Sequence, residues 1–585
     1  MAEPIFDLLV LGDLLNGRTG RPRDLHKDDL DAFLASSAPT TRNGGMRFTT
    51  FRDFRPDALV DRNAPTRALA DLRDQLREVA TGRRSAPDLL ASLGSLGIPA
   101  VLADRVRQAL NPSSDPATAP TPPTSAGPQA AAPAPAAPAP VAPADPDDPL
   151  AAIFAQVDVG GSIPAASVSG GVTSALDRLL SGIVGRSSTT PPRGAAEALR
   201  EVESALGAAT LDLLREPEFR ALESSWLGLR FLLKRVDHRA GVHVHLLPTT
   251  ASELTTTLRD LALPYADEIA AEGRTFCLLA DFDLKPETLA EIAPLLEASS
   301  TTLLAGLDPT PLGLSGSDLL SAPDIAAKLD ECAEWKALRS TPAARWVGLT
   351  VNRFLVRAPF GPRGEVVKGN PVEESEGDLP FARGIWPLGE RIAASAARTG
   401  WGLECLGAGA GGLIENLPLR PLISRSGDEV ACCLESSISE QRLLELSRSG
   451  LIALATARNA DHAFFGTAPV LFAPRRGSDD RAYAIDARRA TLPYQLMVAQ
   501  VMNRVRQVLP HIDAAHSARA IADTLAGGLK LLFLSPSGPL FNIEVTSPTA
   551  GQEEATTIGI RLTPVLDPMR GLPDFELELG TPGRQ

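Results

Sequence analysis

A long tract rich in proline and alanine divides this chain and limits what can fold on either side of it. From about Asn111 to Pro149 the sequence is almost entirely Pro, Ala, Ser and Thr. Proline removes a backbone donor and fixes φ, and the other residues bring too little apolar surface to offset the entropy of ordering. We therefore predict a disordered linker over residues 111–149, between a small folded module at 1–110 and a large one at 150–585.

The composition allows a buried core on both sides of the linker and excludes some classes of partner. Hydrophobic residues make up 44% of the chain and charged residues 22%, which are ordinary values for globular proteins. The formal net charge is −14. An acidic chain disfavours nucleic acid as a partner, because neutralising phosphates requires a basic face, and it disfavours an anionic membrane surface for the same reason.

The chain has the features expected of a cytoplasmic protein that is not inserted into a membrane. Its five cysteines are odd in number and irregularly spaced, so they predict no disulfide framework. The apolar run at the N-terminus has no basic residues before it and is interrupted by Asp7 and Asp13, unlike a signal peptide. No segment has the roughly 18 uncharged apolar residues of a membrane span.

The small module is predicted to be a compact α/β unit. Ile5–Leu15 is an apolar run of strand length, and residues 28–36 place their apolar side chains on one face of a short helix. Residues 46–54 alternate as a strand would. Pro56 predicts the start of a helix, and the apolar residues between Leu69 and Val79 follow the spacing of an amphipathic helix.

The large module is predicted to be a mixed α/β core that ends in β segments. Helical periodicity predicts helices at 172–183, 199–213 and 219–236, and apolar runs predict strands at 242–248, 274–283 and 301–307. Near the end, residues 540–547, 556–566 and 574–580 alternate as strands joined by turn-rich loops, which favours antiparallel pairing. The whole chain is therefore predicted to be α/β, of the mixed α+β kind.

Several segments of the small module are similar to a known family. LLVLGDL, DDLDAFL, RFTTFRDFRPDALV and LADLRDQLREV occur in this order between residues 5 and 80. Together they resemble the small subunit of the contractile sheath of bacterial type VI secretion systems. FRDFRPDALV is the most specific of these segments.

The large module resembles the large subunit of the same sheath over residues 195 to 580. The resemblance is carried by EPEFRALESSWLGLRFLL, EWKALRSTPAARWVGLTVNRFLVRAPFG, GWGLECLGAGAGGLIENLPL, ISEQRLLELSRSGLIAL, LPYQLMVAQVMNRV and the closing β segments. Their fixed order is more specific than any one motif. The two families are obligate partners and are usually separate chains, so this chain resembles a fusion of the small subunit to the large one.

The resemblance implies a structural role. Such a subunit polymerises in the cytoplasm around an inner tube and contracts to propel it, and no nucleotide is consumed in the stroke. Neighbouring copies are tied together by exchanged β-strands from the C-terminal arm of the small subunit and the N-terminal arm of the large one. The implied partners are further copies of the chain, the inner tube protein, baseplate components and a sheath-recycling ATPase, although no segment here matches the helix that engages the ATPase. The alternative is a non-contractile ring, shell or scaffold with the same fold.

Four patterns that could indicate a ligand or charged-contact site are better explained structurally. GAGAGG at 407–412 lacks the following helix of a dinucleotide loop, since Pro418 and Pro421 come too soon, so we interpret it as a backbone turn. His243 and His245 share one strand face without a third ligand nearby in sequence, which favours a solvated face over a metal pair. Asp281 and Asp283 end a strand, where they more often terminate pairing and cap the next helix.

The fourth pattern is an acidic run, Glu373, Glu374, Glu376 and Asp378, interpreted as a solvated loop that could also face basic residues of a neighbouring copy, such as the arginines at 21–27. The sequence contains no P-loop motif and no recognisable motif that pairs a catalytic nucleophile with a base. The sequence therefore predicts no catalytic, cofactor-binding or metal-binding residue, and a protein that is not an enzyme.

Overall fold

The computed structural model describes residues 6–41, 45–111, 194–409, 411–423, 427–477, 479–511, 518–546 and 557–580. The chain forms two compact units. One joins the residues up to Ala70 with those from Glu203 onward, and the other falls within Asp71–Val202. Apart from Asn111, the linker predicted at 111–149 lies outside the described residues, as does the helix predicted at 172–183.

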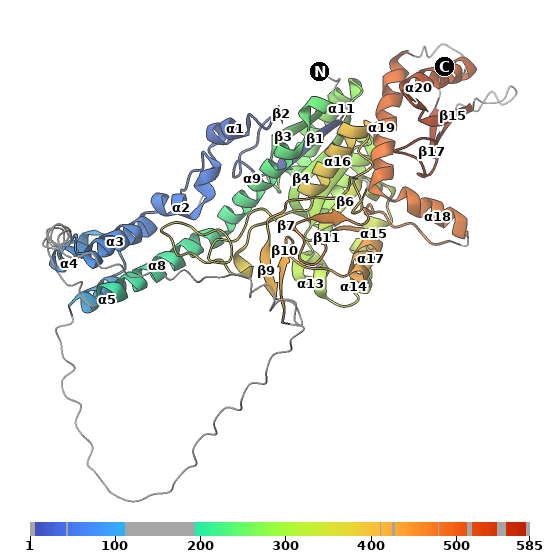
Figure 1. Cartoon of the computed structure of the whole chain (residues 1–585). Helices are drawn as coiled ribbons and strands as arrows, with labels where there is room; N and C mark the ends of the chain where they lie inside the picture. Colours follow the sequence, from blue (N-terminus) through green and yellow to red (C-terminus); the bar gives the residue numbers. More distant parts are fainter. Residues whose placement is uncertain are drawn as a thin grey trace, which may run out of the picture. The chain divides into compact units, whose positions relative to one another are not determined.

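The larger unit is built on an eight-stranded sheet in the order β12-β11-β6-β5-β4-β1-β3-β2, part of which is visible in Figure 1. The inner strands are parallel, and the edge strands β2 and β12 are antiparallel to their neighbours. The strand bounds are β1 Phe6–Gly12, β2 Arg23–Asp24, β3 Val242–Pro248, β4 Thr275–Leu284, β5 Thr302–Leu307, β6 Val347–Val351, β11 Leu451–Thr456 and β12 Ala463–Phe465.

The N-terminal strand β1 is a central strand of this sheet. It pairs with β3 on one side, where Phe6 lies opposite Val242, and with β4 on the other. All seven of its residues are buried, as a strand covered on both faces requires, and its run FDLLVLG is correspondingly apolar. The strand predicted at 5–15 is therefore confirmed. The division into modules at 1–110 and 150–585 stays a prediction, but residues 6–70 lie in the same compact unit as the residues after Glu203.

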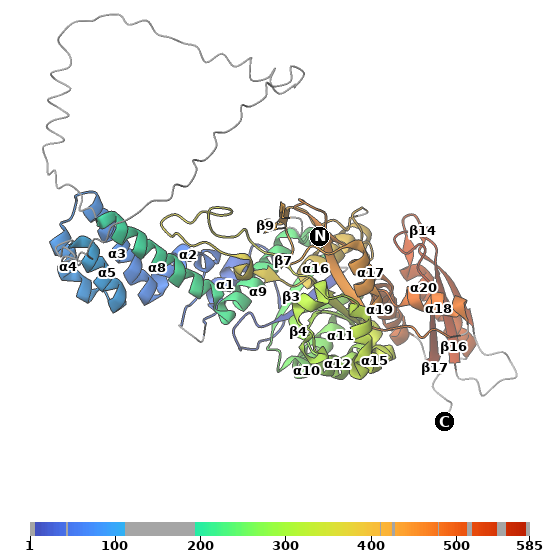
Figure 2. The same ribbon diagram turned by 90° about the horizontal axis from the view of Figure 1, so that it is seen from below.

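Helices cover both faces of the sheet. In Figure 2, strands β3 and β4 lie between α16 on one side and α10, α11 and α12 on the other. The helix bounds from residue 195 onward are α8 Ala195–Arg215, α9 Pro217–Arg235, α10 Leu254–Thr257, η4 Leu258–Ala262, α11 Leu263–Ala271, α12 Pro286–Ser299, α13 Gly316–Ser321, α14 Ile325–Glu331, α15 Ala333–Arg339, α16 Ile385–Thr399, α17 Glu440–Arg448, α18 Asp480–Arg489, α19 Leu492–Val508 and α20 Ala518–Leu532. The predicted helices at 199–213 and 219–236 and the three predicted strands are confirmed, so the mixed α/β prediction is correct.

An aromatic cluster holds the segment after β1 against helix α9. This segment contains α1 (Leu30–Ser37), the 3₁₀ turn η1 (Phe51–Phe54) and α2 (Pro56–Arg62). The Trp226 ring on α9 lies 5.6 Å from the Phe33 ring and 6.3 Å from that of Phe51, and its indole N–H donates to the Leu14 carbonyl at 3.0 Å. The segment is thus anchored by ring packing and by a buried hydrogen bond.

The strand predicted at 46–54 is wrong in its second half. Arg47 makes an isolated bridge with Thr40, but the chain then turns into η1. The carboxylate of Asp53 accepts hydrogen bonds from the backbone N–H groups of Thr49 and Thr50, at 2.6 and 2.9 Å. This capping box starts a helical turn where alternation alone predicted an extended strand.

The C-terminal β segments form a separate three-stranded antiparallel sheet, as predicted. Its order is β15-β16-β17, with bounds Phe541–Thr546, Thr557–Pro564 and Phe575–Gly580. Ile558, Ile560 and Leu562 are buried on one face of β16, and the residues between them are more exposed. Short two-stranded sheets complete the unit: β7 Phe354–Leu355 with β8 Phe381–Ala382, β9 Arg420–Ile423 with β10 Glu429–Cys432, and β13 Leu534–Ser535 with β14 Gly538–Pro539.

The smaller unit is a set of helices around its own core. It contains the later part of α3 (Ala64–Ala80), α4 (Ala86–Ser92), α5 (Ala100–Leu110) and the start of α8. Its core is Leu72, Leu76, Val79, Leu89, Leu93, Val106, Leu110, Ala195, Ala198 and Val202. The helix predicted between Leu69 and Val79 is confirmed. No helix of the described residues is long and apolar enough to cross a membrane.

The position of β1 predicts that the whole sheet depends on it. Replacing Val10, which is fully buried on the central strand, by Asp places a carboxylate in the apolar layer that packs against the sheet. We expect Val10→Asp to destabilise the larger unit by several kcal/mol, because burying an unpaired polar or charged group is strongly unfavourable. Soluble yield and thermal unfolding by circular dichroism measure the effect. Lys27→Asp, at an exposed position of the same segment, is the control, and equal behaviour of the two variants would contradict the assigned role of β1.

Candidate functional site

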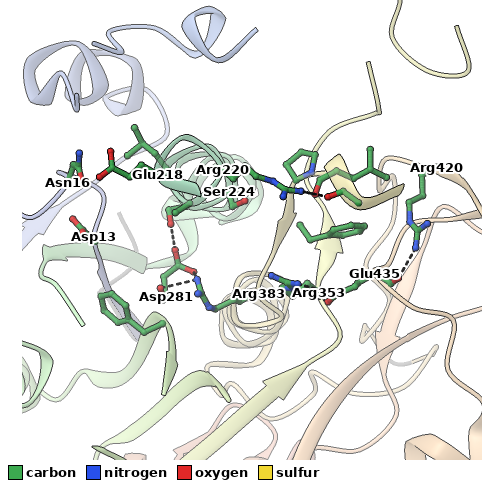
Figure 3. Close-up of a pocket in the computed structure, with 18 of the residues that line it drawn as sticks. Asp13, Asn16, Glu218, Arg220, Ser224, Asp281, Arg353, Arg383, Arg420 and Glu435 are labelled. Carbon is green, nitrogen blue, oxygen red and sulfur yellow. Dashed lines mark hydrogen bonds and ion pairs between the residues drawn. The ribbon is translucent and has the colours of Figure 1, made fainter. Parts of the chain in front are cut away.

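A polar cavity lies at the carboxyl ends of the central strands, where the strand order reverses. Its volume is about 810 Å³, and Figure 3 shows its lining. From β1 the chain passes to β3 on one side, and the later strands β4, β5 and β6 follow on the other. Open parallel sheets bind ligands at such a switch point, so this is where an active site of this fold would be expected.

The cavity is lined by charged side chains from segments far apart in the sequence. Asp13 and Asn16 follow β1, Asp281 lies near the end of β4, and Glu218 to Ser225 belong to α9. The remaining lining comes from the residue before β7, the end of the loop between β7 and β8, the start of β9 and the residues that follow β8 and β10. The charged residues of this remaining group are Arg353, Glu376, Arg383, Arg420 and Glu435.

Arg383 joins the two aspartates at the end of β4. Its Nε and Nη2 donate to the two carboxylate oxygens of Asp283 at 2.8 and 2.9 Å, and its Nη1 donates to Asp281 at 3.0 Å. Burial alone would lower the pKa of Arg383, yet Asp283 and Asp281 raise it above its ordinary value. A fixed cation already holds both carboxylates, so they are not arranged to bind a metal. Neither caps α12, whose N-cap is Lys285, so the predicted capping role is wrong.

The buried Arg420 guanidinium holds the other end of the cavity. It donates to Glu376 at 2.9 Å and to the carbonyls of Leu434 and Glu435 at 3.3 and 2.6 Å. Beside it, Arg353 forms a bidentate pair with the Glu435 carboxylate at 2.6 and 2.9 Å. Paired in this way, the arginines of the cavity fasten protein segments to one another.

A buried triad fixes the loop between β7 and β8. Arg357 pairs with Glu223 of α9 and with Glu374 of the loop, both at 2.7 Å, and its guanidinium lies 3.9 Å from the centre of the Phe360 ring. The side chains of Glu223 and Glu374 are 2% and 0% exposed. Burial alone would lower the pKa of Arg357, but the two carboxylates raise it, so the cation is held charged.

The interpretation of the acidic run as a solvated loop is therefore wrong for Glu374 and Asp378, while Glu373 and Glu376 are exposed as it predicted. Glu374 belongs to the triad, and Asp378, only 5% exposed, pairs with Arg215 of α8 at 2.6 Å. Glu376 pairs with Arg420. Glu373 remains exposed. Three of the four carboxylates are thus paired with arginines of their own chain, so few of them are available to pair with basic residues of a neighbouring copy.

The interpretation of the histidine pair as a solvated face is also wrong. His245 is buried, its Nε2 lies 2.8 Å from Asp7 of β1, and Tyr265 lies 3.1 Å from its Nδ1. His243 lies 3.0 Å from Asp24, whose carboxylate raises the pKa of His243. Among the described residues no group of three His, Cys, Asp or Glu side chains could hold a metal ion.

The glycine-rich segment forms a turn, as predicted. Gly407 and Gly411 have positive φ angles of 81° and 85°, and the Gly407 N–H donates to the Phe465 carbonyl at 2.8 Å. Ala410 lies outside the described residues. No helix begins in the described residues that follow, up to α17, so the segment has no helix N-terminus to offer a phosphate.

The side chains that line the cavity are arranged to hold segments of the chain together and not to catalyse a reaction. Nucleophilic catalysis needs a nucleophile beside a base, and Ser224 and Ser225 have no histidine or lysine beside them among the described residues that line the cavity. The arginines that join the segments around the cavity were not predicted from the sequence. The only signal was that Arg353 and Arg357 fall within the motif VNRFLVRAPFG, because their partners lie far away in sequence.

Comparison with known proteins agrees with the sequence motifs of the large module. The sequence model of the VipB family (EvpB/VC_A0108, tail sheath N-terminal domain) matches residues 196–471. Those residues are therefore similar in sequence to the VipB tail sheath family. A curated relative, the type VI secretion system sheath protein TssC1 of Pseudomonas aeruginosa, is 27% identical over 332 residues, covering 51% of this chain and 67% of the relative.

Two solved structures are similar to this chain at low sequence identity. The helical sheath of the anti-feeding prophage in its contracted state is 10% identical, with a TM-score of 0.33, and the match covers 59% of this chain and 79% of that one. The baseplate of the same prophage is 12% identical, with a TM-score of 0.31, over 62% of this chain and 78% of that one. The similarity to the sheath family rests on the sequence matches alone.

The buried triad predicts that the loss of Arg357 and the loss of Arg458 will have unequal effects on stability. Arg357→Met leaves Glu223 and Glu374 buried without a cation, so we expect a loss of about 3–5 kcal/mol in the free energy of unfolding. Arg458→Met removes only an exposed pair with Asp428, worth at most about 1 kcal/mol. Denaturant titration measures both. Adding Glu223→Gln and Glu374→Gln to Arg357→Met should recover part of the loss, and equal losses for the two single variants would refute the role of the triad.

Asp378 predicts a defined acid sensitivity. Burial raises its pKa, but the hydrogen bonds from Arg215 and Ser375 lower it to about 2. Because the folded pKa lies below the unfolded value, the stabilisation is present above pH ~4 and is lost as the pH falls towards 2. We expect Asp378→Asn to cost about 1–2 kcal/mol at pH 6, discounted for the half-exposed Arg215, and progressively less below pH ~4. Unfolding titrations at a series of pH values check this. A difference that does not change with pH would contradict the prediction.

Proposed function

We propose that this chain is a structural subunit of the contractile sheath of a type VI secretion system and that it contains both sheath subunits, the small one fused before the large one. The observation that carries the proposal is the match of residues 196–471 to the VipB tail sheath domain. The sheath surrounds an inner tube on a baseplate and drives the tube outward. The work is done in the cytoplasm by a strained lattice that relaxes, so the chain needs no catalytic residue and no cofactor.

The position of β1 supports the fusion. The motif LLVLGDL, which resembles the small subunit, spans most of β1, and β1 pairs on both sides with strands of the part that resembles the large subunit. A segment of one sheath subunit thus completes the sheet of the other. Carrying both on one chain fixes their ratio at one to one.

The C-terminal sheet supports assembly through exchanged strands. In the order β15-β16-β17, the outer edges of β15 and β17 have no strand partner in the described residues. An open edge accepts a strand of another molecule through main-chain hydrogen bonds, and such bonds survive a rigid-body rotation of the two molecules. In the sheath family that the chain resembles, such strands come from arms at the junction of the two subunits, and the corresponding joining segment of this chain lies outside the described residues. A recycling ATPase would act on the assembled sheath.

Two replacements of equal length test the roles of this joining segment. Replacing residues 111–149 by Gly and Ser should leave assembly intact, because a passive spacer depends on length and not on sequence. Replacing residues 150–188 in the same way should abolish assembly if these residues supply an exchanged strand. Electron microscopy and light scattering of the purified proteins are the measurements, and the wild type should form long hollow tubes in extended and shortened states. A wild-type monomer under all conditions would refute the sheath proposal, and failure of the first replacement would show that the linker is a contact surface.

A further inference from the structure

Helix α18 presents an outward stripe made of two arginines and two apolar residues. None of the ten residues of the helix is buried. Arg481, Ala484, Ile485 and Arg488 are exposed and fall three and four positions apart, so they share one face. The other side is held by the N-cap Asp479 and by the pair between Arg345 and Asp486 at 2.6 Å. A helix this short gains little stability on its own, so a partner on the open face would stabilise it.

Helix α12 presents an outward stripe of the opposite charge. Its exposed residues are Glu287, Ala290, Glu291, Pro294, Glu297 and Ala298, while Leu289, Ile292 and Leu296 face the core. The face therefore combines carboxylates with small side chains that let another helix come close. Residues 253–340 carry sixteen Asp and Glu against six Lys and Arg, in a chain whose net charge is −14. The helix thus lies in the segment that supplies most of the negative charge.

The two stripes match in spacing. With a rise of 1.5 Å per residue, Arg481 and Arg488 are about 10.5 Å apart along α18, and Glu291 and Glu297 are about 9 Å apart along α12, where they lie on opposite edges of its exposed face. Ile485 lies between the arginines and Pro294 midway between the glutamates. The line that joins the two glutamates is therefore inclined to the axis of α12, and a contact in which α18 crosses α12 brings each arginine to a glutamate and the isoleucine over the proline.

The matching helices lie apart within one molecule. Figure 2 shows α18 beside the C-terminal strands β16 and β17 and away from α12. Arg489 fixes this position by donating to the Asp574 carbonyl at 2.7 Å, and Arg488 donates to the Gly571 carbonyl. The remaining N–H groups of Arg488 can still reach a carboxylate. A contact between the two stripes therefore requires two molecules.

We infer that α18 of one copy docks on the outward face of α12 of a second copy. Each stripe is thus bound by another copy of the same protein, and the inference rests on the self-assembly proposed above. The contact joins two different surfaces, so it repeats from copy to copy and builds a ring or a helical polymer. Each exposed ion pair is weak, but two pairs with an apolar centre repeated along a polymer stabilise it collectively.

Charge reversal tests the contact. Arg481→Glu with Arg488→Glu makes both stripes acidic, and Glu291→Lys with Glu297→Lys makes both basic. Each double variant alone should lower the polymer fraction, measured by sedimentation and electron microscopy, at least about tenfold. Mixed one to one, they should polymerise again, because every contact between unlike copies then joins an acidic stripe to a basic one. Misfolded variants would not be rescued by mixing.

The control and the wild type separate this inference from the proposed function. Lys234→Glu with Arg239→Glu makes the same change of charge at exposed positions of α9 and the turn after it, and should leave polymerisation near the wild-type level. If the wild type polymerises and the stripe variants do so equally well, or if mixing restores nothing, the docking of α18 on α12 is wrong while the sheath proposal stands. A wild type that never polymerises overturns both.

Discussion

The insertion of β1 between β3 and β4 is the constraint on which the rest of the structure depends. The strand pairs along its full length with both neighbours, and its residues are buried on both faces. Without it the central strands would each expose a row of unpaired backbone groups in the middle of the core. Its polar residue, Asp7, is matched by Arg274 and His245 of the neighbouring strand segments. The register of β1 is thus set by charge as well as by apolar packing.

The arginine–carboxylate pairs fix the position of a long loop, as β1 fixes the arrangement of the sheet. Arg215, Arg357 and Arg420 each join the loop around residues 357–379 to a helix or strand that was made elsewhere in the chain. Buried pairs of this kind contribute little net stability, because desolvation offsets much of the Coulomb attraction. Instead they restrict the loop to one position, because any other position would leave a buried charge unpaired. The switch-point cavity, an active site in many proteins of this architecture, is occupied here by such pairs.

Local patterns in the sequence predicted what depends on local physics. The strands at 242–248, 274–283 and 301–307 were found because parallel strands buried on both faces appear as continuous apolar runs. The strand at 46–54 was wrong because one carboxylate, Asp53, turns the chain into a helical turn. The partners of the cavity arginines and of His245 lie up to 238 residues away, so no local pattern could place them. The histidines were therefore read as a solvated face although they are part of the core network.

The main sheet and the C-terminal sheet differ in the length of the strands at their edges. The edges of the main sheet are closed by short antiparallel strands, β2 with two residues and β12 with three, which leave little edge for another molecule to extend. The C-terminal sheet has full strands of six residues at both edges. Because the joining segment is on the same chain as β1, the insertion of β1 is intramolecular, and its entropic cost rises only slowly with the length of that segment. The chain can therefore complete its own main sheet first, and the edges of the second sheet stay open in the described residues.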